Sequence, residues 1–382
     1  MLDDSLLGNP ALLAERDTAG LLRSAATAGA QLRSTGQAAA EAGVDALRGA
    51  RPRALVLLRR PGSSWYSVPL AVALLGPHCP VPVVTAEVVP SWIGPLDVMV
   101  AHTSEPGDRE LADSVGRAVR RGCEVVLSAP PEGPIAAAGA GSARLLEPRL
   151  PVPPGLDFPR ALGTILVTVS ALGLLPVDLD EVAGDLDREL ERDHPTHEPF
   201  VNPAKALALR LADRTPLLLG TDAAATAVAG YAAATLAAHA AVVGYAADAG
   251  EAARAPALQR VLATDPTSDI FHDPFDDPFD DPLAEGRGPA LTVPPRIFLL
   301  STEDDDPRAA VLRRAGRDWP QADSLYPVEE VPPGSGNSIL RRAVVLASRF
   351  DLAALYLGLA SAVLGPDRNS DPDTAGQLSG PV

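Results

Sequence analysis

The feature that most constrains this chain is an alternation of short, apolar, strand-length runs with helix-length segments. The run Ala54–Leu58 contains no polar residue and is too short for a typical helix. Apolar runs of this length, separated by helices, are typical of a parallel sheet that is covered by helices on both faces. A helix is expected over Arg109–Arg121, and the expected strands are Ala54–Leu58, Val81–Thr85, Asp97–Ala101, Glu124–Ser128 and Ala143–Leu146.

The same alternation restarts after residue 200, beyond a proline-rich segment at Pro151–Pro159. In a chain of 382 residues, this repetition predicts two α/β domains rather than one core. The second set of expected elements comprises the helices Asn202–Ala212, Ala223–Ala240 and Ile339–Leu364 and the strands Pro216–Gly220, Val242–Tyr245, Ile297–Leu300 and Ser324–Val328. The predicted layout is two N-terminal helices in 1–50 that join near Asp17–Gly20, a first domain in 51–150, a linker and helix in 151–200, a second domain in 201–364 and a disordered tail in 365–382.

Charge and cysteine content restrict the partners and the compartment. The formal net charge of -17 argues against nucleic acid and anionic membranes, which bind clustered basic residues. The uncharged stretches Ala161–Val177 and Ala223–Ala247 are interpreted as buried helices, because the first is short for a membrane span and the second is mostly alanine. Residues 1–30 show no secretory signal, and Cys79 and Cys123 fit free thiols in a reducing compartment. A cytoplasmic protein is expected.

Three segments could hold a cation. Asp265–Pro282, which repeats Asp-Pro-Phe-Asp, could be a calcium-binding or partner-docking loop, but we interpret it as a solvated loop. Glu303–Asp306 could hold magnesium, although such residues more often cap a helix. His194 and His197 lack an evident third ligand. We therefore predict no metal and no cofactor, and nothing resembles a dinucleotide fingerprint, a P-loop or a Ser-His-Asp arrangement.

Three motifs carry a family resemblance: Phe200-Val201-Asn202-Pro203-Ala204-Lys205-Ala206-Leu207-Ala208, Pro159-Arg160-Ala161, and Asp351-Leu352-Ala353 with Tyr356-Leu357. With them the chain resembles the bifunctional phosphoglucose/phosphomannose isomerases, which are built from two sugar-isomerase (SIS) domains. The resemblance implies a divergent, actinobacterial-type member with two flavodoxin-like SIS domains after an N-terminal helical segment. It also implies a homodimer with an active site shared between subunits, and a sugar phosphate or other carbohydrate derivative as ligand.

In that family, the loop after the first strand is rich in glycine and ends in serine, so that the backbone can approach the sugar. Here Gly62 and Ser63 match this pattern, whereas Arg59 and Pro61 stand where glycines are expected. The first half of the implied phosphate cradle is therefore only partly retained.

The second loop of the cradle departs further from the family. Thr103 matches in register, but Glu105 and Asp108 fall on phosphate-binding positions. A carboxylate about 4 Å from a phosphate charge costs roughly 4 kcal/mol at an effective dielectric constant near 20. An anionic substrate would therefore be repelled. Alternatively, both acids are ordinary first-turn residues that the helix dipole favours.

The catalytic positions implied by the resemblance carry unsuitable side chains. Ala238 falls on the family's catalytic glutamate and Arg254 on its ring-opening histidine, so neither can exchange a proton at neutral pH. Arg160 retains the cation that contacts the enediolate in the family. His239 and Glu251 are the nearby residues that could substitute as acid and base.

Two hypotheses follow. The first is a catalytically degenerate SIS protein with a binding or regulatory role, a pseudoenzyme of carbohydrate metabolism. The second is an active phosphosugar aldose–ketose isomerase with rearranged active-site residues. Lys205 is the only lysine, so any chemistry that requires an amine side chain must use it. The family's lysine near the C-terminus has no counterpart.

Overall fold

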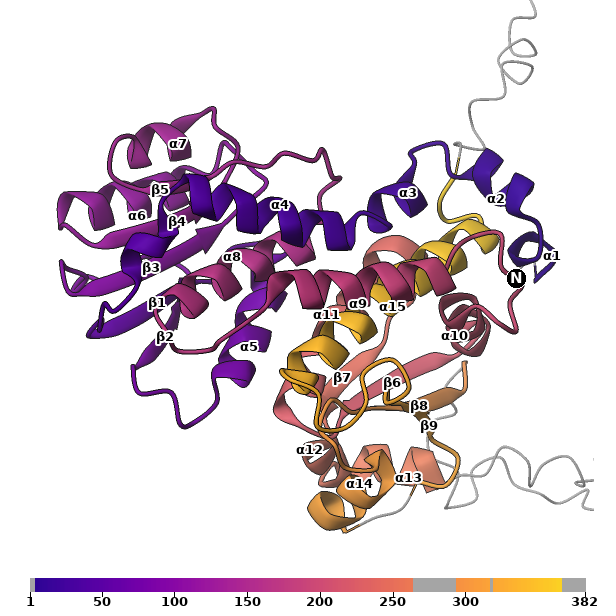
Figure 1. The fold of residues 1–382 in the computed structure, drawn as a ribbon. Helices are drawn as coiled ribbons and strands as arrows, with labels where there is room; N and C mark the ends of the chain where they lie inside the picture. The colour runs from indigo at the N-terminus through magenta and orange to yellow at the C-terminus, as the bar shows by residue number, and fades with distance from the viewer. Residues whose placement is uncertain (1–3, 264–292, 317–318, 366–382) are drawn as a thin grey trace, which may run out of the picture.

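The computed structural model describes residues 4–263, 293–316 and 319–365 (Figure 1). The acidic segment Asp265–Pro282 lies outside the described residues, as does nearly all of the tail expected after residue 364.

The N-terminal segment contains four short α-helices and a 3₁₀ turn, so the prediction of two helices is wrong. Asn9 interrupts the first helix because its side-chain oxygen accepts the backbone N–H groups of Ala11 and Leu12 and caps the second. Gly20 adopts a left-handed conformation, with φ of 65°, immediately before the third. The elements are α1 (Asp4–Leu7), α2 (Pro10–Arg16), α3 (Leu21–Ala25), α4 (Ala28–Glu41) and η1 (Val44–Leu47).

The first sheet has five parallel strands in the order β2-β1-β3-β4-β5. The central strands are buried on both faces, which is why their sequences are nearly continuous apolar runs. All five predicted strands form, with shifts of one or two residues at some ends. The elements are β1 (Ala54–Leu58), α5 (Ser64–Leu75), β2 (Val83–Ala86), β3 (Asp97–His102), α6 (Arg109–Arg120), β4 (Glu124–Ser128), α7 (Pro134–Gly139) and β5 (Arg144–Leu146).

The second sheet repeats the order of the first four strands, as β7-β6-β8-β9, and is also parallel. The strand expected over Val242–Tyr245 is misplaced. Ala241 ends the preceding helix in a left-handed conformation, and Gly244 packs against Pro216, so pairing starts only at Tyr245. The elements are α10 (Pro203–Leu211), β6 (Thr215–Gly220), α11 (Ala223–Ala240), β7 (Tyr245–Asp248), α12 (Ala249–Ala253), α13 (Pro256–Ala263), β8 (Pro295–Leu300), α14 (Pro307–Ala315) and β9 (Asp323–Leu325).

Three long helices, α8 (Phe158–Ala171), α9 (Leu179–Arg192) and α15 (Ser338–Ala360), run between the two sheets (Figure 1). Helix α8 packs on β3 and β4 of the first sheet, while α15 packs on α9, α10 and α11. One apolar cluster includes residues of both sheets and of these helices, among them Leu57, Leu162, Leu218 and Val344. The two α/β halves therefore share one continuous core.

Helix α15 is long and apolar enough to cross a membrane by length and composition, but its most apolar part, a window of 18 residues, is wholly buried inside the molecule. Its buried arginines Arg341 and Arg349 form ion pairs with Asp185 and Glu189 on α9. Removing one partner of such a buried pair is costly because an uncompensated charge remains. Its burial and its ion pairs make it a helix of the core.

Candidate functional site

The candidate site lies where the carboxyl ends of β1 and β3 meet. The chain leaves β1 toward β2 on one side and leaves β3 toward β4 on the other, so the strand order reverses at this point. In open parallel sheets, ligands bind in the crevice that this reversal creates. We call the polar side chains that converge here the first corner: Ser63, His102, Ser104, Ser128 and Asp157.

The centre of the first corner is the carboxylate of Asp157, which is 2% exposed. Ser63 donates its hydroxyl to Oδ1, and Ser104 donates its hydroxyl to Oδ2. The Nε2 atom of His102 lies 3.0 Å from Oδ2. Ser63 and Ser104 lie in the loops after β1 and β3, and His102 is the last residue of β3. Asp157 is the residue directly before α8.

The hydrogen bonds at Asp157 keep it ionised. Burial by itself would raise the pKa of this carboxyl, but the hydrogen bond and charge attraction from His102, with the hydroxyls of Ser104 and Ser63, outweigh burial. The pKa of Asp157 therefore lies well below its ordinary value of 3.8. The first corner holds a negative charge across the physiological pH range.

No Ser-His-Asp arrangement is evident in the sequence, but the fold brings these three residue types together. Ser128 Oγ lies 3.0 Å from His102 Nδ1, and the other ring nitrogen faces Asp157. The histidine and the aspartate are 55 positions apart, so no local motif links them. Ser128 is 1% exposed, which leaves its hydroxyl closed to a substrate. The arrangement is a sealed polar cluster.

Beside the first corner, Arg60 neutralises the acids that lead into α6. Its Nη2 lies 2.7 Å from Asp108 Oδ2, and its Nη1 lies 2.7 Å from Glu110. Asp108 also caps α6 by accepting the N–H of Leu111 at 3.0 Å. Glu105 is exposed. Asp108 therefore acts as a helix cap with a paired charge, and sequence reasoning missed its arginine partner.

The other candidate residues in the loops after β1 and β3 serve the local structure of those loops. Arg59 donates to the carbonyl of Trp65, and its guanidinium carbon lies 3.9 Å from the centroid of the Trp65 ring. Gly62 has a φ of 94°, a conformation that side chains disfavour. Thr103 Oγ1 accepts the N–H of Glu105 at 3.0 Å.

The positions matched to the family's catalytic residues are not brought together. Ala238 is exposed near the end of α11. Arg254 is exposed directly after α12, where it pairs with Glu251 at 2.8 Å. Arg160 is buried and donates to the carbonyl of Leu150 at 2.6 Å. Burial lowers the pKa of Arg160, with Asp157 acting in the opposite direction.

Helix α11 still approaches the first corner through an aromatic contact. The ring of Tyr231 stacks on Phe158, the residue after Asp157, with centroids 4.2 Å apart. The half-buried His239 faces Gly155 in the segment that leads to Asp157, and burial lowers its pKa. The two halves of the chain thus meet beside Asp157.

The single lysine is structural. Nζ of Lys205 donates to three backbone carbonyls, those of Leu7 at 2.7 Å, Pro195 at 2.6 Å and His197 at 2.8 Å. All three of its hydrogens are engaged. Lys205 therefore ties the N-terminal helices and the His194–Glu198 loop to α10.

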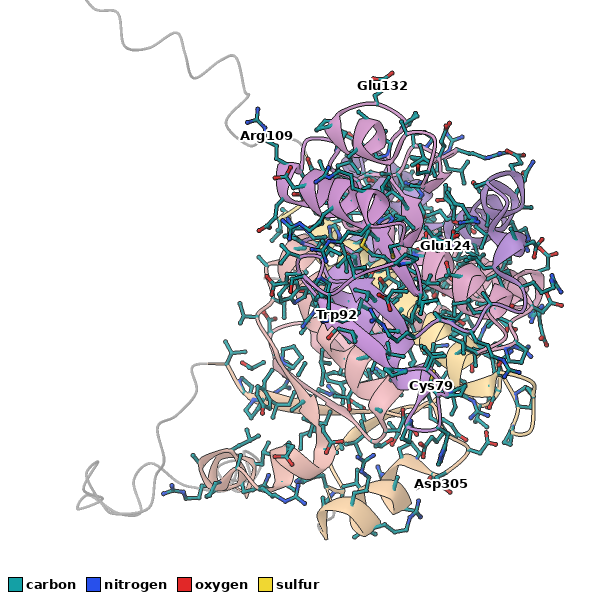
Figure 2. The ribbon with its side chains drawn as sticks, turned by 90° about the vertical axis from the view of Figure 1, so that its left-hand side faces the viewer. Cys79, Trp92, Arg109, Glu124, Glu132 and Asp305 are labelled. Atoms are coloured by element: carbon teal, nitrogen blue, oxygen red, sulfur yellow. The ribbon has the colours of Figure 1, made fainter. Side chains whose placement is uncertain are left out.

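The second sheet has an equivalent place between β6 and β8, which we call the second corner: Asp222, Thr302 and Glu303. Asp222 caps α11 by accepting the N–H of Ala225 at 2.8 Å. The Asp222 carboxylate also accepts hydrogen bonds from the N–H of Thr302 at 2.8 Å and from the Thr302 hydroxyl at 2.7 Å. A further one comes from the N–H of Glu303 at 3.4 Å. Figure 2 places Arg109, which starts α6 beside the first corner, far from Asp305 in the loop of the second.

Three of the four acids in Glu303–Asp306 have protein partners. Asp304 pairs with Arg342 at 2.6 Å, Asp305 pairs with Arg313 at 2.6 Å, and Asp306 caps α14. Within residues 4–263, 293–316 and 319–365, no group of three His, Cys, Asp or Glu side chains is placed to hold a metal ion.

These two parallel sheets, with helices between and around them, constitute the SIS fold. Solved structures of similar fold support this assignment. The sequence matches no protein-family model and no curated protein. In structure, the chain is similar to tagatose-6-phosphate ketose/aldose isomerase from Escherichia coli, with 10% identity, a TM-score of 0.57 and coverage of 89% of this chain and 91% of that one. It is also similar to the C-terminal domain of glucosamine-fructose-6-phosphate aminotransferase from Francisella tularensis, at 9% identity and a TM-score of 0.56, covering 90% and 96%.

A third similar structure is a hypothetical protein from Thermus thermophilus, at 13% identity and a TM-score of 0.58, covering 93% of this chain and 91% of that one. At such low identities, the likeness establishes the fold over nearly the whole chain.

Proposed function

We propose that this chain is a non-catalytic SIS protein, with a binding or regulatory role related to carbohydrate phosphates. The observation that carries the proposal is the closed first corner. Asp157 takes the hydroxyls of Ser63 and Ser104, which lie on the two loops where sugar-isomerase folds hold phosphate. An enzyme of this kind needs those donors free for its substrate.

The side chains expected to perform isomerisation support the same proposal. Proton transfer between the two carbons of an aldose requires a base within hydrogen-bond reach. Ala238 supplies none, and Arg254 is held by Glu251 on the surface. The alternative is an active isomerase that uses Arg160, with His239 and Glu251 as acid and base. His239 is half-buried and has no hydrogen-bond partner among those found in the described residues, while Glu251 is exposed and paired with Arg254.

The finer assignment belongs to the same proposal. The motifs Phe200–Ala208 and Pro159–Ala161 support descent from the bifunctional phosphoglucose/phosphomannose isomerases. With that descent we propose a cytoplasmic homodimer and a boundary between two SIS domains within residues 151–200.

A coupled assay with the purified protein tests the proposal. Glucose 6-phosphate, mannose 6-phosphate and fructose 6-phosphate are each supplied at millimolar concentration, and interconversion is followed. We expect no turnover above the background of a heat-denatured sample. Turnover at an ordinary enzymatic rate, about 1 s⁻¹ or faster, would overturn it.

A further inference from the structure

We infer that the Asp157 carboxylate is an internal stand-in for a phosphate group, and that the first corner becomes a phosphate-binding site when this carboxylate is removed. The inference rests on the proposed function and specifies how its site is kept closed. The ligand class is an oxyanion of the phosphate type, either inorganic phosphate or a phosphate monoester.

The donors of the first corner are those that an oxyanion requires. Two hydroxyls, from Ser63 and Ser104, and one imidazole nitrogen, from His102, converge on the two oxygens of one carboxylate. Each donor could equally serve a phosphate oxygen, because a carboxylate and a phosphate both present anionic oxygen acceptors when ionised. Ser63 and His102 are buried and Ser104 is half-buried, so an anion bound here would be largely shielded from water.

The Asp157 carboxylate comes from outside the sheet and does not cap the helix that follows it, α8. An aspartate directly before a helix normally caps it by accepting the N–H of the second or third residue. Asp108, Asp178, Asp222, Asp248 and Asp306 all do so here. Asp157 occupies the same position before α8 and makes no capping hydrogen bond. Its side chain is used entirely in the first corner.

Of the nearby acids, Asp157 is the one that contacts the donors of the first corner, whereas Glu105 is exposed to solvent, which screens its charge. Asp108 and Glu110 are already paired with Arg60. Two unit charges about 4 Å apart, at an effective dielectric constant near 20, repel strongly enough to weaken binding about a thousandfold. Phosphate therefore has to compete with a negative charge that already holds its donors.

The experiment uses the full chain in a buffer free of phosphate and sulfate, with inorganic phosphate titrated calorimetrically. Asp157→Ala should bind phosphate about a hundredfold more tightly than the wild type, because the repelling charge is removed and its donors are freed, while water that fills the vacated space competes for part of the gain. Asp157→Asn removes the charge but still fills the corner and keeps one carbonyl acceptor on its donors, so its gain should be much smaller than that of Asp157→Ala. Asp178→Ala removes an exposed capping aspartate elsewhere and is the matched control.

Asp157→Ser keeps a small polar partner for His102 and serves if the alanine variant is unstable. Adding Ser104→Ala to Asp157→Ala or Asp157→Ser should weaken the gained phosphate affinity about tenfold, because one donor is lost. A folded Asp157→Ala or Asp157→Ser protein that binds phosphate no more tightly than Asp178→Ala overturns the inference. The inference is also overturned if the wild type binds phosphate as tightly as Asp157→Ala does and Ser104→Ala abolishes that wild-type binding.

These outcomes separate the inference from the proposed function. Inorganic phosphate has no isomer, so its binding reports only on the corner. Wild-type isomerase turnover would remove the proposed function, whereas failure of the Asp157 variants to gain phosphate would remove only the inference. Repeating the titration with fructose 6-phosphate distinguishes a site for phosphate alone from one that also accepts a sugar.

Discussion

An aspartate carboxylate closes each of the two corners, but the two aspartates come from different places in the chain. Asp222 follows its own strand β6 directly and is held mainly by backbone N–H groups, those of Ala225 and Thr302. Asp157 lies far along the chain from the loops it closes and is held only by side chains, those of Ser63, Ser104 and His102.

This difference separates a structural closure from a removable one. A carboxylate that satisfies backbone groups at the start of a helix stabilises the fold itself, and without it those groups are left unpaired. A carboxylate that satisfies only hydroxyls and an imidazole occupies a site that another oxyanion could fill. The first corner is thus the candidate ligand site, and the second is an element of the fold.

The largest expected effect contrasts the two aspartates in phosphate binding. Asp157→Ala should gain about a hundredfold in affinity, whereas Asp222→Ala should gain none, because the carboxylate of Glu303 remains close to the freed groups and repels an anion. Calorimetric titration of both variants makes the comparison. A comparable gain in Asp222→Ala would mean that the corners are chemically alike.

The next effect concerns stability. Asp222→Ala should lower the free energy of unfolding by about 2–4 kcal/mol, because it removes a helix cap and leaves the buried Thr302 amide and hydroxyl unpaired. Asp178→Ala, which removes only a cap at an exposed position, should cost about 1 kcal/mol. Urea unfolding measures both. Equal losses would show that Asp222 is an ordinary cap.

A pH titration of stability should also single out the first corner. The pKa of Asp157 is lower in the folded protein than its ordinary value of 3.8, so the unfolded chain binds the proton more readily. The stability that Asp157 provides is therefore present above about pH 4 and is lost as the pH falls below that value. Relative to wild type, Asp157→Asn should show a shallower loss of unfolding temperature below pH 4. Parallel curves would contradict the assigned ionisation.

The smallest effect is expected at the position matched to the family's histidine. Arg254→Ala breaks only an exposed ion pair with Glu251, so the free energy of unfolding should change by less than about 0.5 kcal/mol. Phosphate affinity in the Asp157→Ala background should be unchanged. A marked loss of that affinity would place Arg254 at the first corner and reopen the isomerase hypothesis.

Much of the fold was predictable from residue patterns. The strands Ala54–Leu58 and Glu124–Ser128 and the helix Ala223–Ala240 have the predicted bounds, because an apolar run between polar loops has few ways to bury itself. The errors fall where short-range geometry decides, as at Asn9 and at Gly244 against Pro216.

The site was predictable only in outline. Loop residues such as Ser63 and Thr103 were singled out, but His102, Ser104, Ser128, Asp157 and Arg60 were not. One signal was available: His102 and Ser128 end two strands that a parallel sheet places side by side. The position of Asp157 directly before Phe158-Pro159-Arg160 marked it as a helix cap, and this would have given it the wrong role.

The amino-acid sequence by itself determined the two parallel sheets and the absence of a titratable side chain at Ala238. The first follows because apolar strands must be covered on both faces, and the second because alanine exchanges no proton. Only the tertiary structure decided that the first corner is closed. Asp157 reaches Ser63, Ser104 and His102 because α8 packs across β3 and β4 and brings its first turn to the strand ends. No spacing along the chain encodes that contact.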